Sequence, residues 1–360
     1  MSKSVFSAPL SVCWDLTYRC NLKCIHCCFS SYNCVTNICN EKVPIERMYD
    51  VLDELDKMKI IRLEIAGGEP LLYPQFDSFI KYVQTKHFEI SVVTNGLLLS
   101  QEKLNMLKKC RLTQIQISLD GFTPYIHEFI RGKGTFGKTI EKIRMVLHDN
   151  INLVVAAMVY KENYNRMDEF VEFLYRLKVR YFRIQFLLPI GEAKSNFEQL
   201  FITEEEQDFA IKTVLSNEHV KAGEIRVILP CFYNKKENGQ KIVTESKRFY
   251  SNTCGAGTMH VNINPYGDVS ACTMLTGAEW IEGNIINENF ADIWKCESRF
   301  KKWRNEYSIE GGCKDCSFIN ECRKGCKALT FTVKEKDDLI ANAKCIRTVK
   351  GEEKNDSISV

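Results

Sequence analysis

The sequence has no long apolar run and no marked excess of charge of one sign. It contains no uninterrupted run of 18 apolar residues, which excludes a membrane-spanning helix. The first ten residues lack the extended apolar core of a signal peptide, so we expect a cytoplasmic protein. The 49 basic and 46 acidic residues leave a net charge of +3, which is too balanced to indicate nucleic acid or an anionic membrane as a partner.

Cysteine is scarce only in the middle of the chain. Of the 17 cysteines, Cys110 alone lies between residues 40 and 230, and the others crowd toward the two ends. An odd number of cysteines without an export signal argues against a disulfide framework. Clustered cysteines in a reducing compartment are more often metal ligands or catalytic groups. The sequence therefore predicts two separate sites built from cysteine.

The middle of the chain alternates between strand-like and helix-like segments, which predicts βαβ units and a parallel sheet. Six units are too few for a closed barrel of eight. We therefore expect an α/β fold, a partial (β/α)6 TIM-like barrel with its site at the carboxyl ends of the strands. The predicted strands are Ser11–Leu16, Ile61–Ala66, Glu89–Thr94, Gln114–Leu119, Asn152–Met158 and Tyr181–Leu187, and the predicted helices are Ile45–Met58, Gln101–Lys109, Phe136–Leu147, Asn163–Leu177 and Thr203–Leu215.

The character of the sequence changes after residue 230. Residues 254–345 carry eight cysteines and little periodicity, which predicts a small, loop-rich domain held together by metal rather than by a large core. We therefore divide the chain into a barrel at residues 1–230, a cysteine-rich domain at 231–350 and a flexible tail at 351–360.

The first cysteine group directly follows the first predicted strand. Cys20, Cys24 and Cys27 form a C-x3-C-x2-C pattern that can fold around one metal centre. Structural zinc requires four ligands. Three cysteines on a [4Fe–4S] cluster instead leave one iron open, where a small molecule can bind.

This pattern resembles that of the radical S-adenosylmethionine (radical SAM) superfamily. The resemblance implies that the open iron binds SAM, that electron transfer cleaves its C5′–S bond, and that the resulting 5′-deoxyadenosyl radical abstracts a substrate hydrogen. It extends over roughly residues 12–189 and includes Ala66–Pro70, which is similar to the family's GGEP element. Arg131 is similar to the arginine that pairs with the SAM carboxylate. The full set of implied SAM contacts is His26, Gly67, Gly68, Glu69, Asn95, Ser118, Arg131 and Leu188.

The later cysteines resemble the seven-cysteine signature of the SPASM extension, which is found on peptide-modifying radical SAM enzymes. The resemblance implies two auxiliary [4Fe–4S] clusters, and therefore three clusters in the chain. Cys254, Cys272 and Cys326 would bind the first auxiliary cluster, and Cys313, Cys316, Cys322 and Cys345 the second.

The first auxiliary cluster is one ligand short. Either Cys231 completes it, or an open iron binds substrate; structural zinc is the alternative metal. We expect Cys13, Cys110 and Cys296 to be packed free thiols. The sequence assigns no role to Cys28, Cys34 and Cys39.

The resemblance implies hydrogen abstraction from a peptide or protein, leading to a thioether or carbon–carbon crosslink, epimerisation or side-chain oxidation. The alternative is a small-molecule substrate such as a tetrapyrrole or a sugar. An iron–sulfur electron carrier is less favoured, because a carrier needs no SAM pocket. Thr273, rather than aspartate, follows Cys272, which argues against sulfatase maturation.

The resemblance also implies protein partners. Only 19 residues precede Cys20, so we expect no N-terminal leader-binding domain. Substrate recognition then falls to a separate leader-binding protein or to the barrel and SPASM surface. An electron donor of the flavodoxin or ferredoxin type is the other expected partner.

Overall fold

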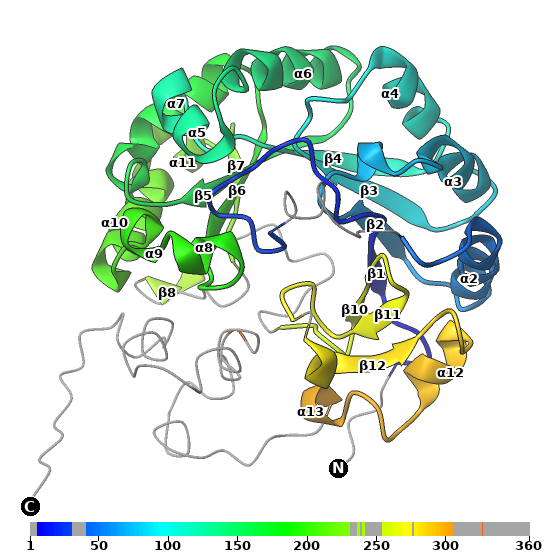
Figure 1. Ribbon diagram of the computed structural model, residues 1–360. Helices are drawn as coiled ribbons and strands as arrows, with labels where there is room; N and C mark the ends of the chain where they lie inside the picture. Colours follow the sequence, from blue (N-terminus) through cyan, green and yellow to red (C-terminus); the bar gives the residue numbers. More distant parts are fainter. Residues whose placement is uncertain are drawn as a thin grey trace, which may run out of the picture.

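The computed structural model describes residues 6–30, 41–230, 236–237, 240–241, 254–275, 277–304 and 326. At its centre, a sheet of ten strands curves into an open arch with helices on its outer side (Figure 1). Within these ranges, no helix combines the length and the apolar character needed to cross a bilayer.

Seven parallel strands follow one another in chain order and form most of the arch. Each pairs with the next in register, from Cys13 opposite Glu64 to Phe182 opposite Val227. The sheet order is β12-β11-β10-β1-β2-β3-β4-β5-β6-β7. The seven are β1 (Ser11–Asp15), β2 (Arg62–Ala66), β3 (Glu89–Thr94), β4 (Leu112–Ser118), β5 (Leu153–Val159), β6 (Tyr181–Phe186) and β7 (Arg226–Ile228).

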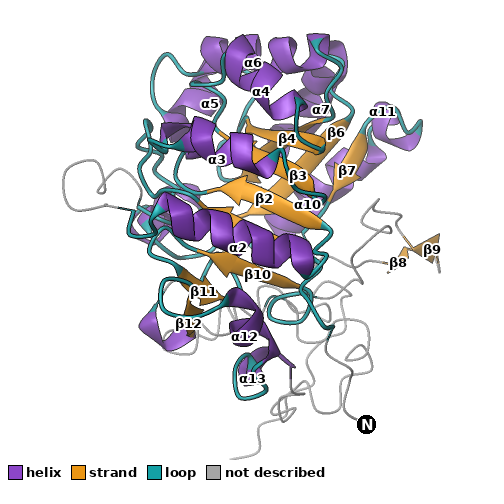
Figure 2. Cartoon of the chain, turned by 90° about the vertical axis from the view of Figure 1, so that its right-hand side faces the viewer, coloured by secondary structure: helices purple, strands orange, loops and turns teal. Residues whose placement is uncertain are grey.

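Helices cover the convex side of these strands (Figure 2), and their buried residues are mostly apolar. In α2, Met48, Val51, Leu52 and Leu55 are all buried, as the spacing of three and four residues predicts. The side-chain oxygen of Ser100 caps α4 and that of Thr123 caps α5, each by accepting a hydrogen bond from a backbone N–H group. The barrel helices are α2 (Ile45–Lys57), α3 (Phe76–Val83), α4 (Gln101–Lys108), α5 (Pro124–Arg131), α6 (Phe136–His148), α7 (Met167–Arg176), α8 (Glu192–Ser195), α9 (Phe197–Leu200), α10 (Glu204–Ser216) and α11 (Glu218–Lys221).

The concave side of the sheet carries polar side chains. Trp14 contacts Phe79 of α3 at 5.6 Å between ring centroids, so it points outward and its neighbour Cys13 points inward. Register places Glu64 and Ser91 in the same inward row as Cys13. The arch is therefore lined by groups that can contact a polar ligand or water.

The cysteine-rich segment joins this sheet. Strand β10 (His260–Ile263) pairs in parallel with β1, and β11 (Asp268–Ser270) and β12 (Ile281–Asn284) follow antiparallel. Helix α12 (Phe290–Lys295) lies beside α2, where Arg47 donates hydrogen bonds to the carbonyl oxygens of Ile285 (2.6 Å) and Glu288 (2.9 Å). A last helix, α13 (Lys301–Arg304), places Trp303 against Gly257.

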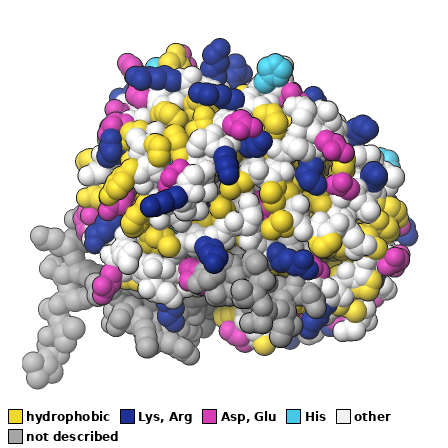
Figure 3. Space-filling view, turned by 45° about the horizontal axis from the view of Figure 1, so that its top comes forward, with side chains coloured by type: hydrophobic (Ala, Val, Ile, Leu, Met, Phe, Trp, Pro, Cys, Tyr) yellow, Lys and Arg dark blue, Asp and Glu magenta, His cyan; other side chains and the backbone are white. Residues whose placement is uncertain are grey.

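The predicted α/β class and partial barrel are confirmed. All six predicted strands are present with small shifts at their ends, and β7 adds a short seventh strand at residues 226–228. The sequence did not predict that β10 would pair with β1, so the sheet crosses the expected domain boundary at residue 230, which itself stays a prediction. On the face in Figure 3, basic and acidic side chains are interspersed, consistent with the small net charge.

Candidate functional site

The first predicted cysteine group lies in the loop after β1, at the carboxyl ends of the parallel strands. Cys24 is buried, and Cys20 and Cys27 are half-buried. Backbone hydrogen bonds attach this loop to three other parts of the fold. They run from Ile25 N to Ile130 O (3.2 Å), from Glu192 N to Cys27 O (2.9 Å) and from Gly68 N to Thr17 O (2.7 Å).

The two glycines of the GGEP element allow the end of β2 to lie against the cysteine loop. A Cβ on Gly67, which has a φ of +136°, would lie 2.3 Å from Thr17 O. A Cβ on Gly68 would lie 2.4 Å from Arg19 O. Any side chain at either position would therefore push the loop away, and glycine is required for this approach.

Glu69 holds two strand ends together. Its carboxylate is fully buried and accepts hydrogen bonds from Thr94 Oγ1 (2.8 Å) and from the backbone N–H groups of Asn95 (2.9 Å) and Leu71 (3.2 Å). Burial raises the pKa of Glu69 to about 7, although these hydrogen bonds oppose the shift. The carboxylate thus ties the end of β2 to the end of β3.

A cavity of about 630 Å³ opens at the carboxyl ends of the strands. Seven of the eight predicted SAM contacts line it; Glu69 does not, because its side chain points into the sheet interior. Cys20, Cys24 and Cys27 line the same cavity. So do Cys254, Cys272 and Cys326, the three cysteines predicted for the first auxiliary cluster. The fold therefore brings the described members of both cysteine groups to one space.

Arg131 and Asp120 form a buried ion pair in this cavity. Arg131 Nε donates to Asp120 Oδ2 at 2.5 Å, and Met158 N donates to Asp120 Oδ1 at 2.9 Å. Burial alone would raise the pKa of Asp120, but the guanidinium of Arg131, together with His26, His127 and the N–H of Met158, outweighs burial and holds that pKa below its usual value. Asp120 is thus an anion that orients Arg131.

The remaining donors of Arg131 face the cysteine loop. Its Nη1 lies 4.0 Å from Cys24 Sγ, and its Nη2 lies 3.5 Å from His26 Nε2. Burial lowers the pKa of His26 to about 4, so the imidazole is neutral near pH 7. Its Nδ1 is buried without a hydrogen-bond partner. His26 therefore offers an unused polar atom at the cavity wall.

Asn95 contacts the loop from the other side. Its Nδ2 lies 2.8 Å from Asn21 Oδ1 and 3.8 Å from Cys20 Sγ, and its Oδ1 accepts from Leu97 N at 2.9 Å. Leu22 N also lies 3.4 Å from the Cys20 sulfur. N–H groups that donate to a cysteine sulfur are among the factors that set the potential of an iron–sulfur cluster.

The cysteine loop suits a metal cluster better than a single zinc ion. Burial raises the pKa of Cys20 to about 12 and that of Cys24 to about 11, so these thiols stay protonated unless a metal replaces the proton. A zinc ion at about 2.3 Å from each sulfur would hold every pair of sulfurs about 3.8 Å apart. The three sulfurs do not all lie within 4.8 Å of one another, a spacing expected when each ligand occupies a different iron.

Matches to family models decide the family. The model of the radical SAM superfamily matches residues 14–174, and that of SPASM, an iron–sulfur cluster-binding domain, matches residues 254–317. The chain belongs to the radical SAM superfamily and carries a SPASM domain. Proteins of this superfamily use SAM and a [4Fe–4S] cluster, and the SPASM domain binds further iron–sulfur clusters.

Relatives of this radical SAM protein include a maturase and a heme synthase. The mycofactocin maturase MftC of Mycobacterium tuberculosis (strain CDC 1551 / Oshkosh) is 29% identical over 330 residues, covering 90% of this chain and 80% of its own. The AdoMet-dependent heme synthase of Methanosarcina barkeri is 23% identical, covering 90% of this chain and 93% of its own. The crystal structure of Streptococcus suis SuiB bound to precursor peptide SuiA has the same fold, with a TM-score of 0.72, 16% identity and coverage of 92% of this chain and 74% of that chain.

The other cysteines of this radical SAM protein lie in varied surroundings. Cys13 is buried in the sheet, and Cys110 is half-buried with its sulfur 3.8 Å from Ile80 O, as expected for packed thiols. Cys296 is partly exposed beside Ser298. Cys28, which had no predicted role, lines the cavity. The predictions for Cys34, Cys39, Cys231, Cys313, Cys316, Cys322 and Cys345 lie outside the described residues.

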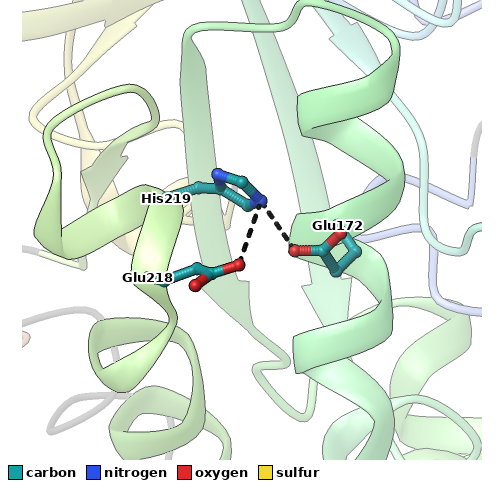
Figure 4. A group of neighbouring side chains, drawn as sticks. All are labelled: Glu172, Glu218 and His219. Atoms are coloured by element: carbon teal, nitrogen blue, oxygen red, sulfur yellow. Dashed lines mark ion pairs between the residues drawn. The ribbon is translucent and has the colours of Figure 1, made fainter.

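A second cluster of titratable groups lies away from the cavity, between α7 and α11 (Figure 4). Nε2 of His219 is 2.8 Å from Glu172 Oε1 and 3.9 Å from Glu218 Oε1, and its Nδ1 is 2.7 Å from Glu224 Oε2. The hydrogen bond that His219 donates to Glu224 raises the pKa of His219 above its usual value. Carboxylates face both ring nitrogens, which favours the protonated, cationic ring over the neutral ring that ligates a metal.

Proposed function

We propose that this protein binds a [4Fe–4S] cluster at Cys20, Cys24 and Cys27, and SAM in the adjoining cavity, to modify a peptide or protein. The observation that carries the proposal is the single cavity lined by this loop, by seven predicted SAM contacts and by three SPASM cysteines. When bound, the cluster and SAM supply the electron and the C5′–S bond whose cleavage starts hydrogen abstraction.

The residues around the loop would hold and orient these groups. Arg131, fixed by Asp120, directs its two outer nitrogens toward Cys24 and His26, next to the space that SAM would fill. A guanidinium suits the SAM carboxylate because it can form two parallel hydrogen bonds. Gly67 and Gly68 bring backbone atoms to the cavity wall. Glu69 would act indirectly, by positioning Asn95, rather than by touching SAM.

In the same proposal, the SPASM domain binds two auxiliary clusters. Cys254, Cys272 and Cys326 would bind the first, at the wall of the cavity, with Cys231 as the candidate fourth ligand. Cys313, Cys316, Cys322 and Cys345 would bind the second. A cluster on the cavity wall lies where it can exchange electrons with a substrate.

A peptide substrate is supported by the maturase among the relatives and by the precursor peptide bound to SuiB on the same fold. The heme synthase among the relatives supports a tetrapyrrole as the alternative substrate. A short open reading frame rich in cysteine or aromatic residues beside the gene would favour the peptide. We also propose a cytoplasmic location, since an odd number of cysteines suits a reducing compartment. The further proposed partners are an electron donor of the flavodoxin or ferredoxin type and a separate leader-binding protein.

The experiment is anaerobic reconstitution followed by iron and 5′-deoxyadenosine assays. We expect about twelve irons per chain from three clusters. Changing Cys20, Cys24 and Cys27 together to Ala should remove about four irons and abolish SAM cleavage. Cys110→Ala, at a thiol outside the cavity, should change neither. Continued 5′-deoxyadenosine formation by the triple variant would contradict the assignment of these three cysteines to the SAM cluster. Stoichiometric zinc without iron would indicate structural zinc sites in place of the clusters.

A further inference from the structure

The deeper part of the cavity contains two polar side chains that the proposed cofactors do not use. Gln116 on β4 is only 5% exposed, and its Oε1 is buried without a hydrogen-bond partner. Arg183 on β6 is half-buried, and its Nε is likewise buried and unpartnered. Both residues line the cavity. A buried polar group without a partner costs free energy, so two in one cavity point to a ligand.

The sheet register brings these two side chains to one place. Ser118, Ala156 and Arg183 lie side by side on β4, β5 and β6, and Gln116 lies two residues deeper on β4. Strands β4 and β6 are about 10 Å apart, and the small Ala156 between them leaves that gap open. The site therefore lies at and below the level of Ser118. Arg183 also precedes Leu188, a predicted SAM contact, by five residues, so Arg183 lies farther into the arch.

The charges of the cavity wall indicate which ligand would fit. Among the described lining residues, the acidic and basic side chains apart from His26 are Asp120, Arg131 and Arg183. Asp120 is neutralised by Arg131, which leaves the charge of Arg183 uncompensated. A half-buried guanidinium without an anion is unfavourable until one binds. The wall is thus complementary to one negative group.

We propose that Arg183 and Gln116 form a receptor for a carboxylate of the substrate. The guanidinium of Arg183 donates two hydrogen bonds to the carboxylate. The Gln116 amide, turned by 180° so that its NH2 group takes the place of the unpartnered Oε1, donates a third. The proposal rests on the proposed function for the nature of the substrate, a peptide. It restricts that substrate to one with an aspartate or glutamate side chain, or a free C-terminus, near the reacting residue.

The test is peptide binding to the anaerobically reconstituted, SAM-loaded protein without a reductant, so that it does not depend on radical chemistry. The probes are acetyl-Ala-Ala-Asp-Ala-Ala-amide, its Asn analogue, and the Asn analogue with a free C-terminal carboxylate, each titrated by ligand-observed NMR. We expect one of the two carboxylate peptides to bind about ten- to 100-fold more tightly than the neutral one. Which of them does so identifies the side-chain or the C-terminal source.

Variants separate recognition from folding. Arg183→Met should reduce this preference to about unity, Arg183→Lys should retain part of it, and Gln116→Leu should lower it by less. Arg180→Met, at an exposed arginine three residues earlier, should leave it unchanged. SAM affinity and iron content should stay at wild-type values in all four variants.

Several outcomes would overturn the receptor. They are equal binding of the three peptides, no binding of either carboxylate peptide, or a preference that survives Arg183→Met. A loss of SAM affinity with an unchanged peptide preference would assign Arg183 to the cofactor instead. Failure of the proposed function is a separate result, since it appears as absent SAM cleavage while peptide binding is still measurable.

Discussion

The guanidinium of Arg131 is shared between a carboxylate and the cysteine loop. Its Nε is occupied by Asp120, and its outer nitrogens lie 4.0 Å from Cys24 Sγ and 3.5 Å from His26 Nε2. A single ammonium cannot reach all of these groups, because it lacks the planar fork. The shape of Arg131 therefore matters here as much as its charge.

Arg131→Lys should weaken SAM binding by about 1–3 kcal/mol, or roughly five- to 150-fold, because one charge-assisted pair is lost. The measurement is SAM affinity by equilibrium binding to the reconstituted protein. Arg166→Lys, at a partly exposed arginine outside the cavity that pairs with Glu169, is the matched control and should leave the affinity unchanged. An unaltered affinity in Arg131→Lys would place the guanidinium outside the SAM site.

Gly191 is a second residue on which the cysteine loop depends. It has a φ of +56°, and a Cβ there would lie 2.4 Å from Cys27 O and 2.5 Å from Cys28 O. Its neighbour Glu192 donates its N–H to Cys27 O at 2.9 Å. The turn after β6 therefore clamps the end of the cysteine loop, and only glycine fits there.

Gly191→Ala should destabilise the protein by more than about 1 kcal/mol and lower iron retention, because the side chain would displace the carbonyls of Cys27 and Cys28. Thermal unfolding and iron content measure the two effects. Gly137→Ala is the control: its Cβ meets nothing within 4 Å in α6, so that variant should be neutral or slightly more stable. Equal stability of the two variants would mean that the clamp is not needed.

Local motifs predicted much of the site, because strand ends in a parallel sheet converge on one edge. Seven of the eight predicted SAM contacts line the cavity on that basis. The orientation of Glu69 was not predictable, since it depends on Thr94 and Asn95 across the strand pair. Gly191 was also missed. Its requirement comes from carbonyls more than 160 residues earlier in the chain, and no local pattern records them.

At the scale of helices and strands, the long periodic segments were predicted, whereas only some of the short ones were. Helices α3, α4 and α5 each have eight residues, and of these only α4 was predicted. Two turns give an apolar period little room to repeat, so the spacing is a weaker signal for helices of this length. The three-residue β7 was too short for the same reason.

The junction of α7 and α11 depends on the charge of His219. The carboxylates of Glu172, Glu218 and Glu224 face its two nitrogens, and the ring of Tyr175 stacks on it at 3.5 Å. The hydrogen bond that His219 donates to Glu224 raises the pKa of His219 in the folded state, whereas an unfolded histidine titrates at about 6.5. The stabilising charge is therefore fully present below about pH 6.5 and is lost as pH rises through the raised pKa.

His219→Gln should consequently lower the melting temperature most at about pH 6 and progressively less toward about pH 9, because the neutral amide removes the titrating charge. Thermal unfolding at several pH values measures the difference from wild type. His148→Gln, at a histidine whose side chain is 90% exposed, should cause little change at any pH. A pH-independent difference for His219→Gln would rule out an ion-pair role.

Across the whole molecule, the barrel and the cysteine-rich segment share one sheet. Ser11 pairs with His260, and the two side chains are also joined by a 3.0 Å hydrogen bond. Asn262 donates to the buried Asp15 at 3.1 Å. Periodicity describes neighbours along the chain, so a pairing between residues 249 positions apart could not be predicted from it. This contact explains how cysteines from the two ends reach the same cavity.

The pairing of β1 with β10 also affects how the protein is made. A ribosome adds roughly 5–20 residues per second. Strand β2 is therefore available to β1 within seconds, whereas β10 follows about 200 residues later, after roughly 10–40 s. During that interval one edge of β1 has no partner strand, and the cysteine loop beside it is not clamped until Gly191 has been added. Unpaired edges invite wrong pairings, so a nascent chain of this protein should benefit from a chaperone that occupies this edge until residue 263 has emerged.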